Sequence, residues 1–145
     1  MACLLDTGIL LRAFDARNPQ CRGIRQALRK LLSRQERLTV ALQNIAEFWN
    51  VSTRPVESNG FGLATDRIGQ RLKLLESGCE VLTESDESYR IWKGLLAAHS
   101  ISGVAVHDAR LVSVMLANGI STIVTLNVKD FRRYSGISAV VPSDV

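Results

Sequence analysis

Short apolar runs alternate with longer segments of helical periodicity along this chain. Strands are expected at the short runs, which occupy 2–5, 38–40, 79–82, 121–125 and 139–141. Helices are expected over the periodic segments at 7–14, 19–34, 41–53, 63–77, from the polar run at 83–87 to about 99, and 106–117. Strands that alternate with helices are typical of βα units on a parallel sheet. The pattern predicts a three-layer α/β fold with a five-stranded parallel sheet.

Residues with strong positional preferences mark the ends of these helices. Pro19 suits the first position of the second helix, because a first-turn residue has no N–H partner to lose. The apolar side chains expected on the inner face of that helix are Ile24, Leu28, Leu31 and Leu32. In the acidic run at 83–87, Thr83 or Ser85 is expected to cap the next helix. The acids there complement the helix dipole, and this interpretation is preferred to a metal site.

Composition indicates one domain over residues 1–145, with enough apolar material for a core. The chain has 145 residues, of which 46% are hydrophobic, and no apolar run approaches the ~20 residues of a membrane helix. Its N-terminus lacks the basic region of a signal peptide. Cys3, Cys21 and Cys79 are far apart in the sequence and odd in number, which favours reduced thiols in a cytoplasmic protein over a disulfide or a zinc site.

Positive charge is concentrated near the N-terminus. The net charge of the chain is +4, and the stretch from Arg12 to Arg37 holds eight basic and two acidic residues. That stretch therefore carries +6, and the rest of the chain carries −2. A basic patch of this kind indicates an anionic partner such as nucleic acid. A solvated helix face explains the charge equally well, and the pattern alone does not separate the two.

Acidic residues stand where α/β proteins collect functional groups, beyond the carboxyl ends of parallel strands. Asp6 directly follows the first strand. Asp108 begins the helix at 106–117 and shares its stripe with Leu111, Val112, Met115 and Leu116, so its side chain is expected to face the sheet. A carboxylate turned inward requires a cation or hydrogen-bond donors. A first-turn acid that interacts with the helix dipole is the alternative.

Two further acids complete the candidate set. Glu47 lies in a strongly apolar helix, where an acid is either paired or functional. Asp130 follows the fourth strand, and Thr125 and Asn127 add oxygen donors there, although a polar turn also explains this segment. Carboxylates that converge on one sheet edge repel each other, and a hard divalent cation relieves the repulsion. Oxygen ligands without a His or Cys cluster point to Mg²⁺ or Mn²⁺.

Four segments of the chain resemble, in order, the motifs of PIN domains, and most closely those of VapC-type toxins of bacterial toxin–antitoxin pairs. The segments are LLDTGILL at 4–11, IAEFWNV at 45–51, VHDARLVSVMLANGI at 106–120 and VTLNVKDF at 124–131. Each motif is weak alone, and the ordered set is fairly specific. The resemblance implies strand order 3-2-1-4-5, a dimer, and a ribonuclease dependent on Mg²⁺ or Mn²⁺ that a small antitoxin protein inhibits.

The resemblance also implies roles for individual residues. Those matched to the acidic quartet that holds the metal are Asp6, Glu47, Asp108 and Asp130. Those matched to the family's polar positions, which would position a phosphate or water, are Thr7, Thr125 and Asn127. Many relatives carry the fourth acid where this chain has Asn127, so Asp130 either substitutes for it or acts through water. Candidates for contact with the RNA backbone are Arg22, Arg25, Arg29 and Arg34.

Two other functions compete with this one. A response-regulator-like phosphoryl-transfer domain would require an Asp after the third strand and a Lys after the fifth, and no Lys follows Val141. A degenerate PIN domain would bind RNA or a protein without cutting it, and Asn127 keeps that alternative open. His107, beside Asp108, is expected to orient its neighbour rather than to act as a catalytic acid.

Overall fold

A computed structural model describes all 145 residues and contains one five-stranded sheet. Its strands are β1 (Ala2–Leu5), β2 (Arg37–Ala41), β3 (Glu80–Leu82), β4 (Thr122–Val124) and β5 (Ser138–Val140). They pair in the order β3-β2-β1-β4-β5, and every pairing is parallel. The predicted α/β fold and the strand order implied by the resemblance are both confirmed.

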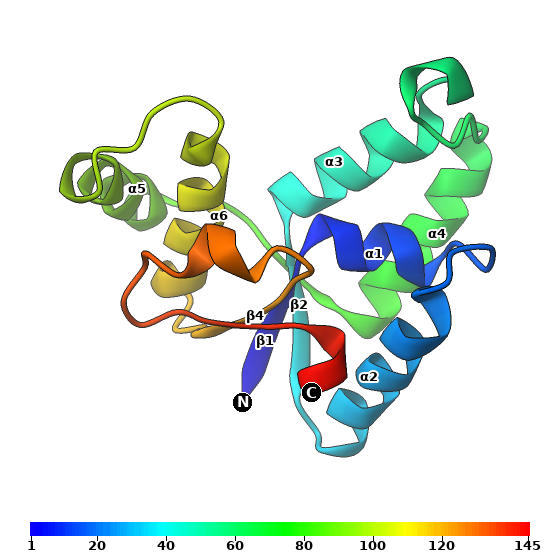
Figure 1. The fold of residues 1–145 in the computed structure, drawn as a ribbon, viewed down its shortest axis with the longest axis horizontal. Coiled ribbons are helices and arrows are strands. Elements are labelled where there is room, and N and C mark those ends of the chain that lie inside the picture. The colour runs from blue at the N-terminus through cyan, green and yellow to red at the C-terminus, as the bar shows by residue number, and fades with distance from the viewer.

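Helices cover both faces of this sheet. They are α1 (Thr7–Ala13), α2 (Cys21–Ser33), α3 (Leu42–Thr53), α4 (Thr65–Gly78), α5 (Asp86–Ala98) and α6 (Ala105–Ala117). Three short 3₁₀ turns are η1 (Val56–Ser58), η2 (Val128–Phe131) and η3 (Pro142–Asp144). Helices α1 to α4 gather on one side of the sheet, and α5 and α6 lie on the other (Figure 1).

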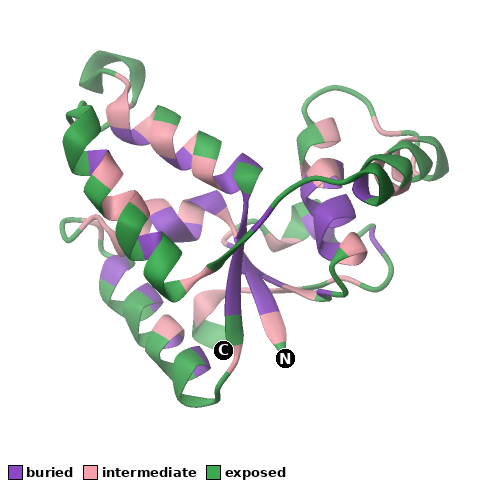
Figure 2. Ribbon diagram, turned by 180° about the vertical axis from the view of Figure 1, so that it is seen from behind, coloured by how far each residue is buried: buried purple, intermediate pink, exposed green.

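The apolar core forms two clusters, one on each face. In β1, Cys3 and Leu5 belong to the cluster under α1 to α4, whereas Leu4 belongs to the cluster under α6. Successive strand residues point to opposite faces, so a strand covered on both sides must be apolar throughout. This explains why the first strand reads as the unbroken apolar run ACLL, and Figure 2 shows β1 largely buried.

The second helix differs from its prediction in its first residue and in its buried face. Helix α2 begins at Cys21, and Pro19 lies in the preceding turn, where the Asn18 side chain accepts from the Gln20 N–H at 2.8 Å. The prediction that Pro19 occupies the first helical position is therefore wrong. Leu32 is 51% exposed. The buried stripe of α2 follows a spacing of three to four residues through Cys21, Ile24, Ala27 and Leu31.

The acidic run before α5 has the structural role that was predicted for it. Ser85 caps the helix, because its hydroxyl accepts from the Ser88 N–H at 3.1 Å and its own N–H donates to the Ser88 hydroxyl at 2.8 Å. Thr83 is not the cap. On the other side of the sheet, the expected loop at 56–62 contains η1, and α4 begins at Thr65 rather than at 63.

Candidate active site at the carboxyl edge of the sheet

Asp6 lies where β1 passes into α1, at the centre of the sheet. Its backbone N–H donates to the Val124 carbonyl at 3.0 Å, which joins it to β4. One carboxylate oxygen, Oδ1, accepts from the Thr7 N–H at 2.8 Å, so that Asp6 caps α1. The other, Oδ2, accepts from the Thr125 hydroxyl at 2.7 Å. Both oxygens are therefore held, and the second donor lies 119 residues away in the sequence.

Glu47 projects from α3 toward the same edge and is held in a similar way. Its Oε2 accepts from the Thr7 hydroxyl at 2.7 Å, and its Oε1 accepts from the Gln43 amide at 3.1 Å. The Thr7 hydroxyl also accepts from Asn44 Nδ2 at 3.2 Å. Thr7 thus contacts Glu47 through its side chain and Asp6 through its backbone, and it links the two acids.

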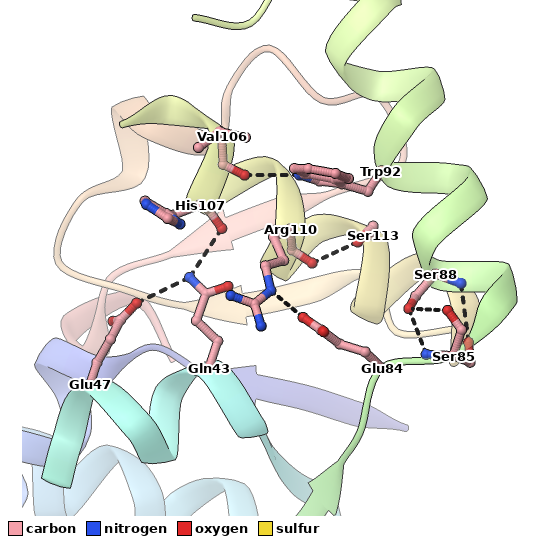
Figure 3. Close-up of polar contacts among 10 residues, drawn as sticks. All are labelled: Gln43, Glu47, Glu84, Ser85, Ser88, Trp92, Val106, His107, Arg110 and Ser113. Carbon is pink, nitrogen blue, oxygen red and sulfur yellow. Dashed lines mark hydrogen bonds and ion pairs between the residues drawn. The ribbon is translucent and has the colours of Figure 1, made fainter. Parts of the chain in front are cut away.

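Gln43 was not singled out from the sequence. It is buried in the first turn of α3, and its Nε2 donates both to Glu47 Oε1 and to the His107 carbonyl, each at 3.1 Å. Figure 3 draws the Gln43 amide between these two acceptors. Its place one helical turn before Glu47 was the available signal, because residues at i and i+4 are neighbours on one helix face.

The first turn of α6 is contacted from both sides. Gln43 of α3 donates to the His107 carbonyl, and the Trp92 indole N–H of α5 donates to the Val106 carbonyl at 3.0 Å. Both contacts appear in Figure 3. Asp108 lies in this turn, half-buried. The packing of α3 and α5 against α6 therefore fixes the position of the turn that carries Asp108.

Asp108 and Asp130 lack the support that Asp6 and Glu47 have. No hydrogen bond reaches either carboxylate, and Asp130 lies exposed on η2. The chain contains two ion pairs, Arg37–Glu80 and Arg110–Glu84. None of the four candidate acids is therefore neutralised by a basic side chain.

The electrostatics of the site reflect this lack of compensation. Burial raises the pKa of Asp6, and the nearby charges of Glu47 and Asp130 raise it further against the hydrogen bonds from Thr125 and Thr7. Burial also raises the pKa of Asp108, to about 6, and the charges of Asp130, Asp6 and Glu47 add to that shift. His107 acts in the opposite direction on Asp108. The negative charges of Glu47 and Asp130 thus act on both Asp6 and Asp108.

The donor set suits a hard divalent cation, although it is not assembled around one. No three Asp, Glu, His or Cys side chains lie close enough together, as they stand, to hold a metal ion. None of the four carboxylates has a basic partner, and the charges of the other acids act on Asp6 and Asp108; a cation that prefers oxygen ligands would relieve this repulsion. That these four residues ligate a metal remains a prediction.

The polar residues predicted to position a phosphate or water lie beside the acids. Thr125 is fully buried, and its hydroxyl accepts from the Asn127 N–H at 3.0 Å while it donates to Asp6. Thr7 and Thr125 therefore support acids directly, and their contact with a phosphate or water remains a prediction. The Asn127 side chain is exposed beside them. Arg110, next but one to Asp108, is engaged with Glu84.

The basic stretch lies along α2 and extends away from the acids. Four exposed residues form the arginine surface, namely Arg22, Arg25, Arg29 and Arg34. Its far end approaches the amino edge of the sheet, where the Arg37 N–H donates to the Met1 carbonyl at 2.9 Å. The four residues of β1 separate that edge from Asp6 by about 13 Å at ~3.3 Å per residue. Arg25 Nε donates to the Ala13 carbonyl at 2.8 Å.

None of the helices combines the length and the apolarity that crossing a bilayer requires.

The family model of the PIN domain matches residues 3–137. A comparison of the sequence with curated proteins finds no match.

Solved structures share this fold at low sequence identity. VapBC2 from Rickettsia felis, bound to a promoter DNA fragment, is 20% identical with a TM-score of 0.71, over 97% of this chain and 98% of that one. VapBC-1 from nontypeable Haemophilus influenzae is 17% identical with a TM-score of 0.69, over 99% of each chain. VapC20 from Mycobacterium tuberculosis, a toxin that cleaves the sarcin–ricin loop, is 14% identical with a TM-score of 0.58, over 83% of this chain and 86% of that one.

Proposed function

This chain belongs to the PIN-domain family, and from that premise we propose that it is a divalent-metal-dependent ribonuclease that acts as the toxin of a toxin–antitoxin pair. The observation that carries the proposal is a group of four acids at the carboxyl edge of the sheet without a basic partner. Two of them, Asp6 and Asp108, have raised pKa values because they are buried near other carboxylates. A protein that needed these positions only for stability would be better served by apolar or paired side chains.

The residues that would hold Mg²⁺ or Mn²⁺ are Asp6, Glu47, Asp108 and Asp130. When bound, such a cation supplies an activated water and stabilises charge on a phosphodiester. Asp6 and Glu47 are already oriented by Thr125, Thr7 and Gln43. Asp108 and Asp130 have side chains free of hydrogen bonds, so that both can turn toward a shared ligand without breaking one.

The proposed partners follow from the charge of the chain and from its structural neighbours. RNA would be drawn to the arginine surface on α2, since arginine contributes the sequence-independent part of nucleic-acid binding. Two of the neighbours described above are VapBC complexes, and one of them is bound to DNA. We propose by analogy that this chain forms a homodimer and is held inactive by a small antitoxin protein.

The decisive experiment measures RNA cleavage by the purified protein with Mg²⁺ or Mn²⁺, with and without EDTA. Cleavage should require the metal, and Asp108→Asn should abolish it, because the substitution keeps the shape of the side chain and removes its charge. Asp86→Asn is the matched control, because Asp86 is also a first-turn acid but belongs to the exposed start of α5. It should retain full activity.

Three outcomes would contradict the proposal in different ways. Full cleavage in EDTA would remove the metal requirement. Full activity of Asp108→Asn would remove that acid from the site. If no RNA is cut with either metal while RNA or a protein partner still binds, the chain is a degenerate PIN domain that acts as a binding module, the function that Asn127 in place of the usual fourth acid favours.

A further inference from the structure

Gln43 is a buried polar residue between two parts of the candidate active site. It is 8% exposed, and its side chain extends from the first turn of α3 toward the first turn of α6 (Figure 3). The Nε2 group donates at 3.1 Å to Glu47 Oε1 and at 3.1 Å to the His107 carbonyl. Glu47 is one candidate metal ligand, and His107 immediately precedes another.

The chemistry of these neighbours determines how the amide is oriented. A carboxylate and a backbone carbonyl only accept hydrogen bonds, so the NH₂ group must face both of them. Its two N–H groups are then fully used. The amide oxygen, Oε1, is left buried without a hydrogen-bond partner.

An unpartnered buried oxygen is unfavourable for stability and calls for an explanation at a native site. A methionine or leucine at position 43 would fill similar space without that cost. The glutamine is explained if its two donated hydrogen bonds position the acids, one directly at Glu47 and the other at the carbonyl that precedes Asp108. Thr7 holds Glu47 Oε2, so that Gln43 on Oε1 completes the support of this carboxylate from two directions.

We propose that Gln43 is a positioning residue for metal binding, an inference that rests on the proposed function. By holding Glu47 Oε1 and the carbonyl of His107 with one amide, it sets the spacing between the Glu47 carboxylate and the turn that carries Asp108. Each carboxylate oxygen has lone pairs left for a cation after it accepts one hydrogen bond. Residues that orient metal ligands in this way typically change metal affinity or activity by about 10- to 100-fold when they are replaced.

A purely structural role would involve the same hydrogen bonds, because Gln43 also connects α3 to α6. The two roles differ in what they predict for metal affinity in the folded protein. A structural tie affects the melting temperature and leaves the affinity of folded molecules unchanged. A positioning residue affects the affinity even where the protein is fully folded.

The test uses the full chain with Gln43→Met, which keeps the length of the side chain and removes both donors. Gln70→Met is the matched control, because Gln70 is exposed on α4 and takes no part in the site. Mn²⁺ binding is measured without RNA by electron paramagnetic resonance of the free ion, at a temperature where circular dichroism shows each variant folded. Thermal melting and the Mn²⁺ dependence of RNA cleavage are measured in parallel.

We expect Gln43→Met to weaken Mn²⁺ binding by about tenfold or more and to raise the Mn²⁺ concentration for half-maximal cleavage by the same factor. The rate at saturating Mn²⁺ should change much less, and Gln70→Met should match the parent protein. If Gln43→Met does not fold, Gln43→Asn replaces it, because its amide is one methylene too short to reach both acceptors, and it should weaken Mn²⁺ binding by a similar factor.

Two results would overturn the inference, and they are distinguishable. Unchanged Mn²⁺ affinity in the variant, beside a parent protein that binds Mn²⁺ and cuts RNA, would leave Gln43 a structural tie and the proposed function intact. A parent protein that neither binds Mn²⁺ nor cuts RNA with any divalent metal would remove the proposed function and this inference with it.

Discussion

The candidate active site has two halves that differ in how firmly their acids are held. In the half formed by β1, α1 and α3, every carboxylate oxygen of Asp6 and Glu47 accepts a hydrogen bond from a neighbouring residue. In the half formed by α6 and η2, neither Asp108 nor Asp130 accepts any, and Asp130 is exposed. One half is prearranged, and the other is free to adjust.

This difference has a physical consequence for a metal site. Prearranged ligands do not have to lose side-chain freedom when a cation binds, whereas free ligands do. The free half nevertheless carries a carboxyl group with a pKa of about 6, because burial and repulsion from the other three acids act on it without a compensating hydrogen bond. The held half should therefore contribute most of the affinity, and the free half should be the more sensitive to pH.

The largest expected effect separates the two halves by activity. Asp6→Asn should reduce metal-dependent RNA cleavage by more than about 100-fold, because it removes the charge of a proposed metal ligand. Loss of a residue that only supports a ligand typically has a smaller effect, of about 10- to 100-fold. Asp130→Asn should cost only about tenfold, because Asp130 is exposed and no hydrogen bond holds its carboxylate in place. Initial rates at the Mn²⁺ concentration that gives half-maximal cleavage by the parent protein provide the measurement. Equal reductions in the two variants would show that the halves contribute alike.

A second prediction concerns the support of the held half. Thr125→Val keeps the shape of the side chain but removes the hydroxyl that bonds Asp6 and the Asn127 N–H. The free energy of unfolding should fall by about 1–3 kcal/mol, the cost of leaving such groups unpaired. Urea unfolding measures this change, and Thr125→Ser, which keeps the hydroxyl, should recover most of it. An unchanged free energy in the valine variant would mean that Asp6 is not held by this hydroxyl.

A third prediction sharpens the description of the free half through pH. The folded-state pKa of Asp108 is about 6, above its ordinary value of 3.8, so the folded protein takes up a proton before the unfolded chain does. In metal-free buffer, the Asp108 contribution should therefore stabilise the protein as pH falls from about 7 toward 4. Solvent screening limits the gain to about 1 kcal/mol.

Asp108→Asn provides the control for this pH effect. It should be more stable than the parent protein near pH 7 by about the same 1 kcal/mol, because it carries no charge to be repelled. Its stability should also vary less between pH 7 and pH 4. Urea unfolding at several pH values measures both quantities, and a variant less stable than the parent at pH 7 would show that Asp108 has a structural role.

The smallest expected effect on stability lies outside both halves, on the arginine surface. Replacing Arg22, Arg29 and Arg34 by Gln should change the free energy of unfolding by at most about 0.5 kcal/mol, because all three are exposed and none forms an ion pair. RNA binding should weaken, and its salt slope should fall by ~0.7 for each phosphate that the variant no longer neutralises. Arg25 is left in place because it bonds the Ala13 carbonyl. An unchanged slope would identify these arginines as a solvated face.

The alternation of apolar and polar residues was sufficient to predict the strands and helices of the fold. The strand at 2–5, a helix cap at Thr83 or Ser85 and the helix that begins before Asp108 were all predicted, since each depends on neighbours within one or two turns. Local detail was wrong at the start and on the inner face of the second helix. The turn at Asn18 moved the start of α2 to Cys21, and its helical spacing placed Leu32 in solvent.

The candidate acids could be named from their places at strand and helix ends, but their supports could not. Thr125 meets Asp6 across 119 residues, and Gln43 meets the His107 carbonyl across 64. Periodicity reports which face of an element a residue occupies, and it contains no information about which distant element packs against that face. The sequence by itself therefore determined the sheet and the acids at its edge. Only the tertiary structure decided that Asp6 and Glu47 are held while Asp108 and Asp130 are free, because hydrogen bonds between distant segments form only after the helices have packed.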